Sequence, residues 1–124
     1  MKEKIKAKIL VAEDGEDNQI LLSHLLKHLG ADAVIVDNGQ KALDRALEEE
    51  FDLLFLDMQM PILDGYKVAS KLRDENYKTP IVALTANAMD GTKEKCIDAG
   101  CDDYLSKPFS RRDFQLLLDK WINH

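Results

Sequence analysis

Five short apolar segments alternate with segments of helical periodicity along this chain. The apolar segments are residues 9–12, 33–36, 53–56, 81–84 and 103–105. Each is too short for a helix and is typical of a strand. The run at 53–56, with its bulky side chains, suits a strand that is buried on both faces. Strands that alternate with helices form a parallel sheet with helices on both faces, because the crossovers between parallel strands are right-handed. The alternation therefore predicts a doubly wound α/β fold with five parallel strands and five helices.

The segments between the expected strands carry the start and stop signals of helices. Side chains that cap helix N-termini precede three of them: Asn38, Asp64 and Ser110. Glycines that suit a helix end follow two others, which are 17–29 and the weaker, more polar 89–99: Gly30 and Gly100. In the second helix, helical spacing predicts an inward face made of Ala42, Leu43, Ala46 and Leu47.

Composition narrows the class of protein. The 124 residues suit one compact domain, so we expect a single domain over 1–124. The net charge of −6 disfavours a nucleic-acid surface, and no apolar stretch approaches the length of a membrane span. Cys96 and Cys101 match neither a metal-site spacing nor a disulfide framework, and the N-terminus lacks the apolar region of a secretory signal. We therefore expect reduced thiols and a cytoplasmic location.

Polar side chains stand where four of the expected strands end. Glu13 and Asp14 follow the first strand, Asp57 follows the third, Thr85 follows the fourth, and Lys107 comes shortly after the fifth. The carboxyl ends of parallel strands share one edge of the sheet, where open α/β proteins bind ligands. Any one of these residues is also a common turn or cap residue, but four strands that each deliver a compatible group favour a shared site.

The residue types predict the chemistry of such a site. Three carboxylates close together repel one another, and Lys107 is the cation available to offset them. Mg²⁺ is the cation expected to balance their negative charge, because it prefers carboxylate, water and phosphate oxygens. A metal and an ammonium group beside Asp57 would neutralise a phosphoryl group while Asp57 attacks as the nucleophile, and Thr85 would supply a hydrogen bond.

The chain resembles the receiver domain of two-component response regulators over essentially its whole length. The matching features are Glu13-Asp14, Asp57 followed by Met60-Pro61 and Asp64-Gly65, Thr85-Ala86, and Lys107-Pro108-Phe109. This order and spacing of motifs is specific, although no single motif would be. The resemblance implies the strand order 2-1-3-4-5 of flavodoxin-like folds, for which the chemotaxis member of this family is an example.

The resemblance also implies a role for each site residue. Asp57 would accept a phosphoryl group from a phosphohistidine, and Mg²⁺ would be held by Glu13, Asp14, Asp57 and the backbone carbonyl of Gln59. Lys107 would pair with the phosphoryl group. Thr85 and Tyr104 would form a switch that alters the face of helix four, strand five and helix five. The side chains of Gln59 and Asn87 stand at the two positions that tune dephosphorylation.

The last motifs look most like receivers of hybrid sensor histidine kinases. The implied partners are a sensor histidine kinase, a histidine phosphotransfer protein, or both, and the chain would then be a piece of a larger protein or a stand-alone regulator. Two alternatives remain from the residues. A metal-dependent phosphatase or phosphotransferase of the haloacid dehalogenase type also uses a strand-end Asp, but needs a second Asp where this chain has Gln59. A degenerate receiver would bind partners without phosphorylation.

Overall fold

The computed structural model describes residues 7–86, 92–107 and 110–122. Its strands are β1 (Lys8–Ala12), β2 (Asp32–Val36), β3 (Leu53–Asp57), β4 (Ile81–Thr85) and β5 (Asp103–Ser106). Its helices are α1 (Glu16–His28), α2 (Gly39–Glu48), α3 (Gly65–Asp74), α4 (Thr92–Ala99) and α5 (Arg111–Trp121). All strand pairs are parallel and the order is β2-β1-β3-β4-β5, so the expected fold class and strand order are confirmed.

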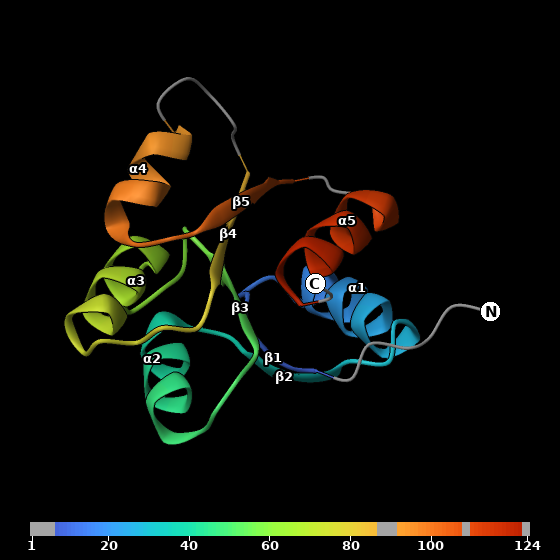
Figure 1. The fold of residues 1–124 in the computed structure, drawn as a ribbon, viewed down its shortest axis with the longest axis horizontal. Coiled ribbons are helices and arrows are strands. Elements are labelled where there is room, and N and C mark those ends of the chain that lie inside the picture. The colour runs from blue at the N-terminus through green and yellow to red at the C-terminus, as the bar shows by residue number, and fades with distance from the viewer. Residues whose placement is uncertain (1–6, 87–91, 108–109, 123–124) are drawn as a thin grey trace.

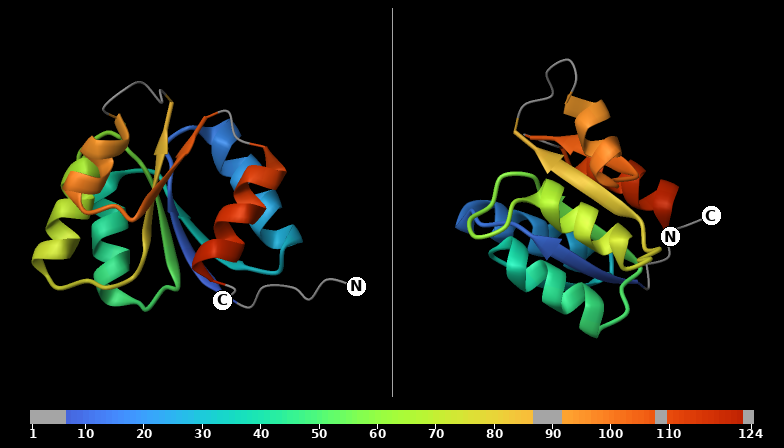
Figure 2. Two further views of the ribbon diagram at one scale, coloured as in Figure 1. Left: turned by 45° about the horizontal axis from the view of Figure 1, so that its top comes forward. Right: turned by 90° about the vertical axis from the view of Figure 1, so that its left-hand side faces the viewer.

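The sheet is the middle layer of three, with α2, α3 and α4 on one face and α1 and α5 on the other (Figures 1 and 2). Strand residues alternate between two hydrophobic clusters, because successive side chains point to opposite faces. Leu54 and Leu56 pack with α2 and α3, whereas Phe55 packs with α1 and α5. The Phe55 ring stacks on Phe114 of α5 with 4.8 Å between the ring centroids. This packing anchors the middle strand, which carries Asp57 at its end.

The predicted helix caps are confirmed. The side chains of Asn38, Asp64 and Ser110 accept hydrogen bonds from backbone N–H groups in the first turns of α2, α3 and α5. Gly30 follows α1 with φ of +88° and Gly100 follows α4 with φ of +118°, a region that favours glycine at helix ends. These local signals set where each helix begins or ends relative to the strand ends.

One predicted inward position is wrong. Leu47 is 50% exposed, whereas Ala42 and Ala46 of the same helix are buried. The contact face of α2 is therefore narrower than helical spacing suggested. Cys96 and Cys101 are both free and buried. For α4, the described part begins at Thr92, and the predicted positions 89–91 lie outside the described residues.

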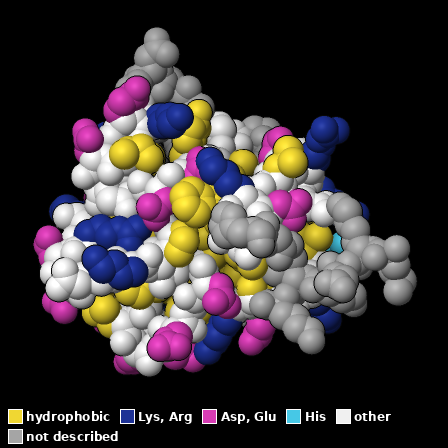
Figure 3. Space-filling model, in the orientation of Figure 1, with side chains coloured by type: hydrophobic (Ala, Val, Ile, Leu, Met, Phe, Trp, Pro, Cys, Tyr) yellow, Lys and Arg dark blue, Asp and Glu magenta, His cyan; other side chains and the backbone are white. Residues whose placement is uncertain are grey.

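On the side seen in Figure 3, Lys and Arg side chains are interspersed with Asp and Glu. Among the helices that the structure describes, none combines the length and apolar character needed to cross a bilayer.

Candidate functional site

The parallel register brings the predicted site residues to one edge of the sheet. β1 and β3 are neighbours, so Glu13 and Asp14, directly after β1, lie beside Asp57 at the end of β3. β4 is the other neighbour of β3 and ends at Thr85. Asp37 follows the edge strand β2, is 56% exposed and pairs with Lys41 on α2, so it lies outside this cluster.

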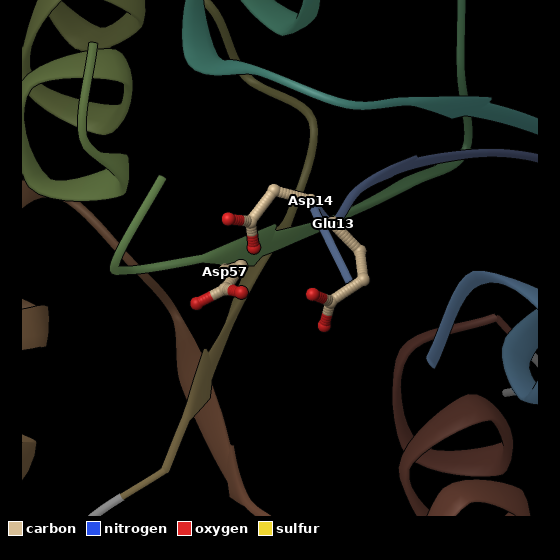
Figure 4. A group of neighbouring side chains, drawn as sticks. All are labelled: Glu13, Asp14 and Asp57. Carbon is tan, nitrogen blue, oxygen red and sulfur yellow. The ribbon is translucent and has the colours of Figure 1, made fainter. Parts of the chain in front are cut away.

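Three carboxylates form the centre of the site (Figure 4). One oxygen from each of Glu13, Asp14 and Asp57 can be chosen such that all three lie within 4.8 Å of one another. Glu13 is 1% exposed and Asp57 is 6% exposed, whereas Asp14 is exposed. The acidic pocket, which we define as Glu13, Asp14 and Asp57, therefore opens to solvent on the Asp14 side.

Lys107 is shared between the two buried carboxylates. Its Nζ lies 2.6 Å from Glu13 Oε1 and 3.1 Å from Asp57 Oδ2. Burial opposes ionisation of Glu13, but hydrogen bonds from Lys107 and from the Gly15 backbone outweigh it and lower the pKa of Glu13. Burial likewise opposes the charge on Lys107, yet the two carboxylates raise its pKa. Glu13 has the closer contact and is the better stabilised anion.

Asp57 is the carboxylate with the poorer balance of charge. Burial is the largest cause that raises its pKa, and the negative charge of Glu13 adds to it, so the pKa rises from 3.8 to about 6. The backbone N–H of Gln59 opposes this shift by donating to Asp57 Oδ1 at 3.0 Å. Asp57 is thus mainly ionised at neutral pH, although its negative charge is only partly offset by its surroundings. A raised pKa from burial and a specific charge partner is typical of functional groups.

Two backbone features hold the site together. The Lys107 N–H donates to the Thr85 carbonyl at 2.7 Å, which extends the pairing of β4 and β5 and directs Lys107 toward the pocket. Gly65, at the start of α3, lies so close to β3 that an added Cβ would stand 2.5 Å from the Asp57 carbonyl oxygen. A residue without Cβ is required there, which explains the Asp64-Gly65 motif.

The remaining predicted residues have different positions. Thr85 is buried at the end of β4, and Gln59 is exposed beside Asp57. Tyr104 on β5 is half-buried, and Lys93 Nζ of α4 lies 5.8 Å from the centroid of its ring. Asn87 lies outside the described residues.

Gln19 is a pocket contact that sequence reasoning missed. Its side-chain Nε2 donates to the Glu13 backbone carbonyl at 2.6 Å. No sequence motif predicts this bond, because a Gln at position 19 is also an ordinary polar residue for the first turns of α1. The contact depends on how the helix folds back over the loop that follows β1.

The donor set fits a hard divalent cation. The carboxylates of the pocket outnumber the one ammonium group that contacts them among the described residues. Mg²⁺ prefers oxygen ligands and keeps several waters, which suits a pocket that is open on one side. No further group of three or more His, Cys, Asp or Glu side chains in the described parts of the chain offers comparable ligand atoms.

Known proteins are similar to this chain in sequence. The family model of the response regulator receiver domain matches residues 9–119. Hybrid signal transduction histidine kinase G of Dictyostelium discoideum is 39% identical over 119 residues, which cover 92% of this chain and 4% of that protein. Sensor histidine kinase GacS of Pseudomonas protegens is 40% identical, with 92% and 13% covered. The chain therefore spans only a small part of these relatives.

Solved structures of receiver domains have a closely similar fold. The receiver domain of sensor histidine kinase PA1611 from Pseudomonas aeruginosa was solved with a magnesium ion in its active site cleft. It matches with a TM-score of 0.89 and 39% identity, and the match covers 96% of this chain and 99% of that one. The receiver domain of Saccharomyces cerevisiae Ssk1, crystallised with the histidine phosphotransfer protein Ypd1, matches with a TM-score of 0.90, 30% identity and 98% and 92% coverage.

Proposed function

Because this chain belongs to the response regulator receiver domain family, we propose that it accepts a phosphoryl group on Asp57 and passes on a signal through that modification. One observation carries the proposal. Asp57 is a buried carboxylate at a strand end, with Lys107 Nζ 3.1 Å from one oxygen and the carboxylates of Glu13 and Asp14 alongside. This is a nucleophile placed among groups suited to a phosphoryl group and a divalent cation.

The proposed reaction is a phosphoryl transfer from a phosphohistidine. An oxygen of ionised Asp57 attacks phosphorus, the P–N bond breaks, and the electron pair leaves with the imidazole of the donor. The product is an aspartyl phosphate, a mixed anhydride. Lys107 offsets the charge of the transferring oxygens, and the Thr85 hydroxyl donates a hydrogen bond to one of them. Mg²⁺, when bound, supplies further charge neutralisation to the same oxygens.

The other site roles belong to the same proposal. Glu13, Asp14, Asp57 and the Gln59 backbone carbonyl hold Mg²⁺. Thr85 and Tyr104 form the switch on the face of α4, β5 and α5, and the side chains of Gln59 and Asn87 tune the dephosphorylation rate. Tyr104 on β5 is half-buried, which supports the switch role because its ring can become either more or less buried.

We propose that the partners are a sensor histidine kinase and a histidine phosphotransfer protein. The hybrid and sensor kinases among the relatives support the first, and the Ypd1 complex of a structural neighbour supports the second. The small share of those kinases that the chain spans supports a receiver within a larger protein. The free, buried thiols support a cytoplasmic location. The assembled pocket favours this function over a degenerate receiver.

Acetyl phosphate tests the phosphoacceptor directly. The protein is incubated with acetyl phosphate and Mg²⁺ and analysed by intact mass. We expect one added phosphoryl group in the wild type, none in Asp57→Asn, and none when EDTA removes the metal. Asp52→Asn is the matched control, because Asp52 is exposed and lies at the opposite end of β3. Equal labelling of Asp57→Asn and the wild type would overturn the assignment.

A further inference from the structure

Glu13 has a hydrogen-bond partner at each of its polar atoms. Its backbone N–H donates to the Val36 carbonyl at 3.0 Å. Its carboxylate oxygens accept from Lys107 Nζ at 2.6 Å and from the Gly15 N–H at 2.9 Å. Its backbone carbonyl accepts from Gln19 Nε2 at 2.6 Å. Of these four contacts, the one from Gln19 is the only one made by a side chain of α1.

The Gln19 contact helps to hold the loop between β1 and α1 in place. The N-cap of α1 is Gly15, which has no side chain to bond the first turn. The Gln19 backbone N–H donates to the Gly15 carbonyl at 2.9 Å, so main chain and side chain of Gln19 together hold the segment between β1 and α1. The carbonyl of Glu13 belongs to the peptide unit that continues into Asp14, and that unit is planar. Its orientation therefore influences the direction in which Asp14 leaves the backbone.

We propose that Gln19 is a positioning residue for the acidic pocket. Its amide orients the peptide unit between Glu13 and Asp14, and through it the two carboxylates that contribute to the divalent-cation site. The inference rests on the proposed function, since it concerns the same pocket. Groups that orient metal ligands by hydrogen bonding affect metal affinity although they do not touch the metal. Gln19 lies on α1 and bonds the backbone carbonyl of Glu13, whereas Lys107 bonds its side-chain carboxylate.

Gln19→Met tests this role, because Met keeps the length of the side chain and removes the donor. The matched control is Gln40→Met on α2, where Gln40 Nε2 donates to Asp44 Oδ1 at 3.0 Å on the surface. Mg²⁺ affinity is measured by calorimetry, and the rate of labelling by acetyl phosphate is measured across Mg²⁺ concentrations. Gln19→Met is expected to raise the Kd for Mg²⁺ roughly tenfold. Its maximal labelling rate at saturating Mg²⁺ remains close to that of the wild type, and Gln40→Met matches the wild type in both measurements.

The outcomes separate the two proposals. Wild-type Mg²⁺ affinity in Gln19→Met would overturn the positioning role and leave phosphorylation of Asp57 standing. An equal loss of affinity in Gln40→Met would overturn it as well, since the effect would not depend on the Glu13 contact. A wild-type protein that neither binds Mg²⁺ nor becomes labelled would overturn the proposed function itself. Gln19→Leu repeats the test with a second side chain that lacks a donor, and circular dichroism at the assay temperature verifies that every compared variant is folded.

Discussion

Replacing Asp57 by Asn is expected to stabilise the metal-free protein at neutral pH. The fold raises the pKa of Asp57 from 3.8 to about 6, mainly by burial and secondly by the charge of Glu13. The unfolded chain restores the ordinary pKa, so the proton is bound more tightly in the native state. This contribution to stability is fully present below pH 3.8 and is lost as the pH rises through about 6. Above that pH the ionised carboxylate opposes folding, and Asn removes the penalty.

The magnitude follows from the size of the shift. A rise from 3.8 to about 6 corresponds to roughly 3 kcal/mol at pH 8, since one pKa unit is about 1.4 kcal/mol. Asn loses the ion pair with Lys107 at 3.1 Å, so we expect a net gain of about 1–3 kcal/mol. For a chain of 124 residues, each kcal/mol changes Tm by roughly 4 °C. The expected rise in Tm is therefore about 4–12 °C at pH 8.

Thermal unfolding followed by circular dichroism in EDTA measures the effect at pH 8 and pH 4. At pH 4 the gain should fall below about 1 kcal/mol, because the wild-type carboxyl is then mostly protonated in the native state. Asp32→Asn is the control, since Asp32 is an exposed aspartate at the start of β2 and should show little change at either pH. Added Mg²⁺ should narrow the difference by binding the native wild type. An unchanged or lower Tm for Asp57→Asn at pH 8 would refute the reasoning.

Three further substitutions probe the pocket and its loops by urea unfolding. Lys107→Met leaves two buried carboxylates without their ammonium partner, so it should lower the free energy of unfolding by about 2–4 kcal/mol at pH 8. Added Mg²⁺ should restore much of this loss. Equal stability of the variant with and without the metal would contradict this prediction. Ile62 has φ of +71° and is 78% exposed, so Ile62→Asn should raise stability by about 0.5–1 kcal/mol, and a loss would show that its side chain packs. Gly65→Ala should lower the free energy of unfolding by about 1–3 kcal/mol and reduce labelling of Asp57, because the added Cβ would stand 2.5 Å from the Asp57 carbonyl oxygen. A variant as stable as the wild type would show that the backbone moves aside easily.

Local signals in the chain were enough to predict most of the fold. The central strands are continuous apolar runs, since both of their faces are buried, and that pattern is visible without a structure. Asn38, Asp64 and Ser110 cap helices by bonding to backbone atoms a few residues away, so their effect is local. The width of the buried face of α2 is set by its neighbours, which is why the inward prediction for Leu47 was wrong.

The sequence by itself determined which chemistry this protein has available. Carboxylates, a hydroxyl and an ammonium group carry their chemistry in their own atoms, and their places at the strand ends follow from the alternation of strands and helices. The tertiary structure alone decided how they share charge. Lys107 lies 2.6 Å from Glu13 but 3.1 Å from Asp57, and burial raises the pKa of Asp57 to about 6. Gln19 and Gly65 meet the pocket only in three dimensions. Such effects depend on distance and on the exclusion of water, which the order of residues does not specify.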